Sequence, residues 1–132
     1  MSKIAILTDS SCDIPQEMAE KYGIDITSFH ILLDDVDYVE RESCTNTEFY
    51  DKMRLSKGVP STAAITPIQF CEKYCQYVDE GYTDVIHVPI NKSGSSTYNN
   101  ALMAQGMLRE ERPEHHMTVS YTHLTLPTKL EV

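Results

Sequence analysis

The sequence lacks the features of several large classes of protein. It has 5 glycines and no tryptophan in 132 residues, and it contains no dinucleotide fingerprint, no Gly-Lys-Ser/Thr phosphate loop and no Gly-x-Ser-x-Gly elbow. No apolar run approaches the roughly 20 residues of a membrane-spanning helix. Basic residues are few, since 11 Lys and Arg stand against 20 Asp and Glu, for a net charge of −9. These absences argue against nucleic acid as a partner, against anionic membrane surfaces and against membrane insertion.

Cysteine is present, but without the spacing of a zinc site. Of the 4 cysteines, Cys71 and Cys75 are one helical turn apart and could in principle hold a metal. No matching Cys/His pair with zinc spacing accompanies them. No signal peptide precedes the first predicted strand. We therefore expect a cytoplasmic chain whose thiols are reduced, packed and inert, with no metal and no cofactor.

The hydrophobic pattern predicts strands that alternate with helices. Short apolar, β-branched runs predict strands over residues 3–8, 24–33 and 83–88, with another beginning at 117–119. Helical spacing predicts helices over residues 15–22, 46–55, 67–78 and 98–108. Because helices of ten to a dozen residues separate short apolar runs, we expect an α/β fold with a mainly parallel sheet flanked by helices.

Several helix boundaries carry capping signals. Thr45 with Glu48, and Thr66 with Gln69, have the spacing of capping boxes. Asp13 is a plausible cap for the first helix. These signals predict where three of the helices begin.

A loop of small polar residues joins the strand at 83–88 to the helix at 98–108. It contains several hydroxyl side chains and one cation: Lys92, Ser93, Ser95, Ser96 and Thr97. A helix N-terminus after such a loop presents unpaired backbone N–H groups and partial positive charge to an anion. An ordinary helix cap explains the same residues equally well, because Ser and Thr are preferred caps in any protein.

Two other stretches place hydroxyls near predicted helix starts. Asp9, Ser10 and Ser11 follow the first strand, so two strand ends carry polar loops and could share one cleft at the carboxyl edge of the sheet. The alternative for these residues is a turn plus a cap. Residues 61–64 form a small, hydroxyl-bearing segment that we expect to be an exposed loop.

Three stretches in order resemble the DegV family. The opening Ile6–Pro15 resembles its amino-terminal signature, Val59–Ala64 corresponds to its Thr-Ser-Gln-Pro-Ser loop, and Ile90–Ala101 resembles its Ser-Ser-x-Leu-Ser-Gly-Thr-Tyr-x-Ser-Ala motif. Together they extend from Lys3 to about Leu108. The resemblance implies a protein, not an enzyme, that holds the carboxylate of a long-chain fatty acid among hydroxyls near the strand ends. Some members of the family present the fatty acid to a fatty acid kinase.

The resemblance also implies ligand-binding residues. Thr62 matches the loop Thr of the family, and Ser95, Thr97 and Tyr98 match its Ser, Thr and Tyr. Among the positions that depart from the motif, three complete the predicted carboxylate site: Asn91, Lys92 and Ser96. Asn91 and Lys92 replace the paired Ser of the family, so the head-group chemistry can differ.

Two other readings stay open at this stage. A hydrolase or transferase that uses the Ser-rich loop would need a base near Ser93 or Ser95, and only distant histidines such as His87 are available. The chain could instead be a fragment that binds nothing.

The end of the chain does not resemble the family. Residues 119–132 resemble a translated sequencing adapter, so we expect a truncated DegV-like domain at 1–118 that lacks the second domain of the family. We also expect residues from about Val119 onward to contribute nothing to the fold.

Overall fold

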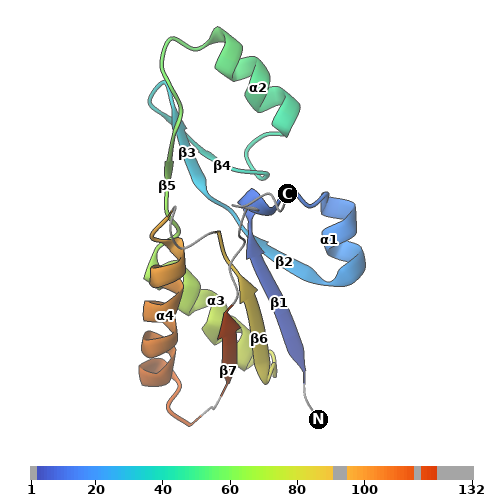
Figure 1. Cartoon of the computed structure of the whole chain (residues 1–132), viewed down its shortest axis with the longest axis vertical. Helices are drawn as coiled ribbons and strands as arrows, with labels where there is room; N and C mark the ends of the chain where they lie inside the picture. The colour runs from blue at the N-terminus through green and yellow to red at the C-terminus, as the bar shows by residue number, and fades with distance from the viewer. Residues whose placement is uncertain (1–2, 91–94, 115–116, 122–132) are drawn as a thin grey trace, which may run out of the picture.

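The computed structural model describes residues 3–90, 95–114 and 117–121. Its backbone forms two sheets that lie end to end along the long axis (Figure 1). The larger sheet has the strand order β2-β1-β6-β7, built from β1 (Ile4–Asp9), β2 (Ile24–Thr27), β6 (Asp84–Val88) and β7 (Thr118–Tyr121). All of its strand pairs are parallel. The predicted α/β fold with a mainly parallel sheet is confirmed.

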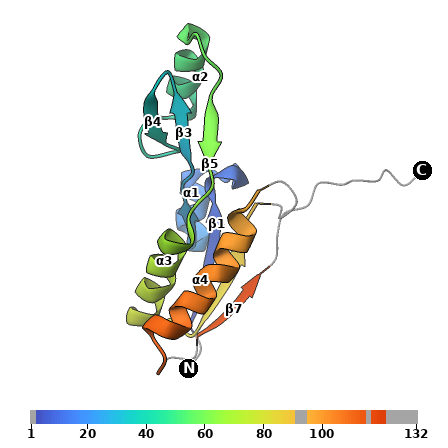
Figure 2. The same ribbon diagram turned by 90° about the vertical axis from the view of Figure 1, so that its left-hand side faces the viewer.

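Four α-helices accompany the sheets in the described residues: α1 (Gln16–Tyr22), α2 (Asn46–Leu55), α3 (Pro67–Asp79) and α4 (Thr97–Glu111). The helices α3 and α4 lie side by side over one face of the parallel sheet (Figure 2), and α1 packs against the edge strand β2 (Figure 1). No helix among the described residues is long and apolar enough to cross a membrane.

The core lies between the parallel sheet and the pair α3 and α4. Alternate residues of the strands, such as Leu7, Val85 and Val119, point into it and meet Phe70 from α3. The opposite face is less covered, since Ile4 is 54% exposed and Ile86 is 39% exposed. A continuous apolar run such as that of the first strand is typical of a strand buried on both faces. Ile4 is exposed instead, because α3 and α4 cover only one face.

A smaller antiparallel sheet follows from the second apolar run. Its strand order is β4-β3-β5, with β3 (His30–Leu33), β4 (Val36–Val39) and β5 (Ser61–Ala63). The run at 24–33 therefore divides into β2 and β3, which belong to different sheets. The predicted loop at 61–64 is wrong in part, because Ser61–Ala63 pairs with β3 although all three of its residues are exposed. Backbone pairing, not an apolar pattern, makes this strand.

Two helices are capped by the residues that the sequence predicts, and a third helix, α1, is not. Both capping boxes form, at Thr45 before α2 and at Thr66 before α3. Asp13 does not cap α1: it adopts a left-handed conformation with φ of 57°, and Pro15 occupies the cap position without a side-chain bond. The capping carboxylate of this region is Asp9, which accepts a hydrogen bond from the Ser11 N–H at the start of the short 3-10 helix η1 (Ser10–Cys12).

The expectation that residues from about Val119 contribute nothing to the fold is wrong for residues 119–121. They complete β7, which pairs in parallel with β6. Val119 is 8% exposed and belongs to the core, and the Tyr121 hydroxyl donates to the Ala101 carbonyl at 2.9 Å. Residues 122–132 lie outside the described residues. The non-native origin assigned to residues 119–132 stays a prediction.

Candidate functional site

The carboxyl end of β1 carries a buried carboxylate. Asp9 is fully buried, and its Oδ2 accepts a hydrogen bond from the Ile90 N–H at 2.7 Å. Its Oδ1 accepts from the Ser11 N–H at 3.0 Å and from the Ser11 hydroxyl. Charge-assisted bonds of this kind are among the stronger ones in proteins. Asp9 therefore ties the polar loop after β1 to the chain that leaves β6.

Further hydroxyls at this edge join neighbouring segments. The Thr8 hydroxyl donates to the Val88 carbonyl at 2.7 Å. Ser10, which is 2% exposed, accepts from the Phe29 N–H at 2.9 Å and donates its own proton to the Glu40 carboxylate. The predicted convergence of polar loops at one sheet edge is present, and most of its hydroxyls hold the edge together.

The start of α4 presents the second polar loop. Thr97 is fully buried, its N–H donates to the Ser95 hydroxyl oxygen at 3.2 Å, and the two hydroxyls lie 2.9 Å apart. Ser96 is exposed and occupies the cap position without a side-chain cap bond. Ser95 is thus the residue that caps α4. The predicted site residues Asn91 and Lys92 lie outside the described residues.

Thr62 reaches this region through the chain that leaves β5. It lies on β5, exposed, opposite Ile31 of β3. Three residues later, the Ile65 carbonyl accepts a hydrogen bond at 2.9 Å from the side-chain amide of Asn100, in the first turn of α4. This bond holds the segment after β5 against the helix start, as Figures 1 and 2 show. Direct contact of Thr62 with Ser95 or Thr97 stays a prediction.

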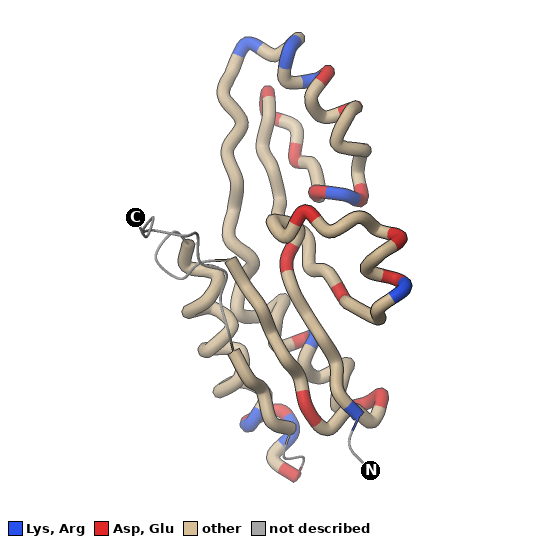
Figure 3. The backbone as a smooth tube through the Cα atoms, turned by 45° about the vertical axis from the view of Figure 1, so that its right-hand side comes forward, with Lys and Arg blue, Asp and Glu red and all other residues tan. Residues whose placement is uncertain are grey.

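Charge near the start of α4 comes from few side chains. Between residues 85 and 108 the sequence contains one Lys and no Arg, Asp or Glu, and that residue is Lys92. In Figure 3, the backbone of β6 after its first residue and of α4 up to residue 108 carries no charged residue, and the described Lys, Arg, Asp and Glu residues lie elsewhere. Because Asp9 already uses the Ile90 N–H, an anion at this edge must bind through other donors. The described candidates are the hydroxyls and N–H groups where α4 begins.

His87 lies beneath the site, in the core. It is fully buried on β6, and its Nδ1 lies 2.6 Å from the Tyr74 hydroxyl. Burial lowers the pKa of His87 to about 4, so the imidazole is neutral at physiological pH. No described hydrogen bond links His87 to a serine, and its Nε2 has no partner among the described residues. Among the described residues, its hydrogen-bond partner is the Tyr74 hydroxyl in the core.

Sequence reasoning missed three parts of this arrangement. Neither of the two interpretations left open for Asp9, a shared polar cleft or a turn plus a cap, includes the hydrogen bond that it accepts from the Ile90 N–H. Glu40 and Asn100 carried no motif at all. The single available signal was that Asp9 directly follows a buried strand, where an unpaired carboxylate is costly.

Comparisons with known proteins identify the family. A family model described as "Uncharacterised protein, DegV family" matches residues 3–125. The chain belongs to the DegV family. The described residues contain no group of three or more His, Cys, Asp and Glu side chains that could hold a metal ion.

Curated relatives agree with the family model. A DegV domain-containing protein of Clostridium perfringens is 35% identical over 111 residues, which cover 84% of this chain and 39% of that protein. One from Clostridium acetobutylicum is 36% identical over 107 residues, with 80% and 38% covered. The chain thus spans about two fifths of the length of these relatives.

Solved structures share the fold. A DegV lipid-binding protein of Thermotoga maritima is 30% identical with a TM-score of 0.76, and 91% of this chain and 41% of that one are covered. A stearic-acid-binding protein of Eubacterium ventriosum is 25% identical with a TM-score of 0.80, with 92% and 41% covered. A second Thermotoga maritima protein, described as revealing a fatty-acid-binding function, is 29% identical with a TM-score of 0.77, with 92% and 42% covered.

Proposed function

We propose that this chain is the amino-terminal part of a fatty-acid-binding DegV protein. It holds the acyl carboxylate where the segment after β5 meets the start of α4. The observation that carries the proposal is the bond between Asn100 and the Ile65 carbonyl, because it brings two hydroxyl-bearing segments of the family motif to one place. The fatty acids named for the structural relatives support the ligand class.

The geometry at the start of α4 suits a carboxylate. A 15-residue helix offers N–H groups and partial positive charge at its first turn. Ser95 and Thr97 orient each other's hydroxyls there, and Thr62 lies on β5, three residues before Ile65. Asn91, Lys92 and Ser96 complete the proposed contacts, with Lys92 as the cation. The role of these residues is binding, not catalysis.

The proposal extends to the partner of the whole protein. A protein that holds a fatty acid by its carboxylate can present that group to a fatty acid kinase in the cytoplasm, and we assign this role to the whole protein of which the chain is part. The hydrolase or transferase alternative finds no support in the described residues, since His87 is buried and bonded to Tyr74.

Ligand content of the purified chain tests the proposed function. The full chain is expressed in a bacterial host, purified without detergent, and extracted for mass spectrometry of lipids. We expect a long-chain fatty acid in sub-stoichiometric to stoichiometric amount. If the chain carries none and fails to bind a fluorescent fatty acid added in solution, it is a non-binding fragment and the proposal is wrong for this molecule.

A matched pair of variants tests the assigned contact. Thr62→Ala should weaken fatty-acid binding by about 1–3 kcal/mol, the scale of a hydrogen bond to a charged group. Ser61→Ala is the control, because neighbouring residues of a strand point to opposite faces of the sheet. Displacement of a fluorescent fatty acid measures both. Equal affinities for the two variants and the parent chain would remove Thr62 from the site.

A further inference from the structure

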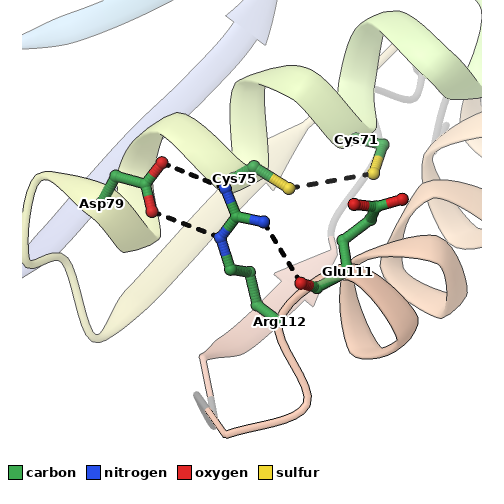
Figure 4. Close-up of polar contacts among 5 residues, drawn as sticks. All are labelled: Cys71, Cys75, Asp79, Glu111 and Arg112. Atoms are coloured by element: carbon green, nitrogen blue, oxygen red, sulfur yellow. Dashed lines mark hydrogen bonds and ion pairs between the residues drawn. The ribbon is translucent and has the colours of Figure 1, made fainter.

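A second cluster of polar side chains lies far from the carboxylate site, in the groove between α3 and α4. Cys71 and Cys75 are one turn apart on α3, and their sulfur atoms are 4.0 Å apart. Figure 4 shows both sulfurs on the side of α3 that faces α4, near Glu111 and Arg112. The groove has a volume of about 660 Å³, and Met107 of α4 also lines it.

We propose that Cys71, Cys75 and Met107 form a binding site for a soft monovalent metal ion, copper(I). The three side chains supply two thiolates and one thioether, which are the ligands that select copper(I) over harder ions. The site is independent of fatty-acid binding. It also differs from the inert, packed thiols that the sequence predicts.

The sulfur separation favours a bridging metal over a disulfide. A disulfide needs a sulfur–sulfur distance of about 2.0 Å and Cβ atoms about 3.8 Å apart, which residues one turn apart on a helix reach only by distorting the backbone. A metal spans the existing gap. With metal–sulfur bonds of about 2.3 Å, a 4.0 Å separation gives a sulfur–metal–sulfur angle of about 120°. That angle is trigonal, so it leaves room for a third ligand.

The set of ligands disfavours zinc. A structural zinc ion takes four nitrogen, thiolate or carboxylate ligands. Among the described residues, no three His, Cys, Asp or Glu side chains are grouped to hold a metal. Met107 supplies the third ligand only to a soft ion, because a thioether is a weak ligand for zinc. Met107 is partly buried, packs against the core and lines the groove.

The surroundings of the site carry charge of both signs, because the carboxylates of Glu72 and Glu111 interact with Cys71 while Arg112 interacts with Cys75. On binding, each thiol transfers its proton to water, and copper(I) with two thiolates carries one net negative charge. Arg112 faces this charge: it forms an ion pair with Asp79 at 3.2 Å and interacts electrostatically with Cys75.

Copper(I) titration tests the site. The reduced full chain is titrated without oxygen, in competition with a chromogenic copper(I) chelator, and thiolate-to-metal absorption is followed in the ultraviolet. We expect one copper(I) per chain. Cys75→Ser should lower the affinity by more than about 100-fold, and Met107→Leu by about tenfold, because even residues behind the ligands contribute factors of 10 to 100.

The other two cysteines provide the control. The double variant Cys12→Ser/Cys44→Ser keeps both proposed thiols and should bind copper(I) as the parent chain does. Met107→Leu preserves apolar volume, so it decides the matter if Cys75→Ser does not fold. The proposal would be overturned if Cys75→Ser bound copper(I) as tightly as the parent chain does. It would also be overturned if the double variant Cys12→Ser/Cys44→Ser lost as much affinity as Cys75→Ser, or if zinc at equal concentration displaced copper(I).

Discussion

The two sheets of this chain are stabilised in different ways. The parallel sheet packs against α3 and α4 over a core of fully buried side chains, among them Leu7, Phe70 and Val85. The antiparallel sheet packs against α2, which has no buried residue, and Leu33 is the single buried residue of its three strands. Tyr38 and Phe49 meet there at a ring separation of 5.8 Å.

This difference in burial predicts that the antiparallel sheet is less stable than the parallel sheet. Regions with few buried apolar contacts open at lower free energy than the core does. A few polar links hold the antiparallel sheet to the rest, such as the bond of Ser10 to Glu40 and that of Arg41 to the Ile14 carbonyl at 2.6 Å. Thr62 lies on this weaker sheet, while Ser95 and Thr97 lie on the stronger part. The proposed site therefore joins the two regions.

Removal of a phenylalanine from each region is the strongest test of this contrast. Phe70→Ala creates a cavity in the core and should lower the free energy of unfolding by about 3–5 kcal/mol. Phe49→Ala removes a half-buried ring and should cost about 1 kcal/mol. Denaturant unfolding followed by circular dichroism measures both. Equal losses would show that the two regions form one cooperative unit of uniform stability.

Acid should destabilise the protein mainly through a histidine of the parallel sheet, His87. The pKa of His87 is about 4 in the fold and about 6.5 in the unfolded chain. As pH falls from about 6.5 to about 4, His87 binds a proton in the unfolded chain but not in the folded chain. The free energy of unfolding therefore declines by about 3 kcal/mol. Its polar neighbours Tyr74 and Tyr121 do not titrate in this range, since burial raises the pKa of each.

Two histidine variants check this assignment. In His87→Gln the decline between pH 6.5 and 4 should shrink by the amount that His87 contributes. In His30→Asn, which changes a half-exposed histidine of the antiparallel sheet, the decline should persist. Unfolding measured at several pH values compares them. A slope that disappears with His30 instead would assign the acid sensitivity to the weaker sheet.

Substitution of an aspartate should also cost more stability in the parallel sheet than in the antiparallel sheet. Asp9→Asn replaces a buried carboxylate that accepts three hydrogen bonds, so we expect a loss of about 2 kcal/mol. Asp37→Asn removes the partner of His30 at a site where Asp37 is 59% exposed, and exposed pairs contribute at most about 1 kcal/mol. Thermal unfolding at neutral pH distinguishes the two. A larger effect at Asp37 would contradict the role given to Asp9.

The smallest expected effect concerns β7. Tyr121→Phe removes the hydroxyl that donates to the Ala101 carbonyl, and should cost about 1 kcal/mol. Tyr50→Phe on α2, where Tyr50 is 59% exposed, should change stability by less than about 0.5 kcal/mol. Thermal unfolding of both variants gives the comparison. No effect at Tyr121 would mean that β7 does not stabilise the protein.

Much of the fold was predictable because its signals are local. The apolar runs at β1 and β6, the capping boxes at Thr45 and Thr66, and the helical spacing along α3 each involve residues a few positions apart. The exposed strand β5 was not predictable in this way, because its three residues have no apolar pattern and pair only through the backbone. Of the predicted site, Ser95 and Thr97 lie together at the start of α4, and their part in binding stays a prediction.

By itself, the sequence determined most of the elements, their order and the family, since periodicity, caps and motifs act within short stretches. The tertiary structure alone decided which of these elements meet. Asp9 binds the N–H of Ile90, 81 residues away, and Asn100 binds the carbonyl of Ile65, 35 residues away. Local propensity carries no information on such pairs. They form only when burial at the sheet edge makes each unpaired polar group costly.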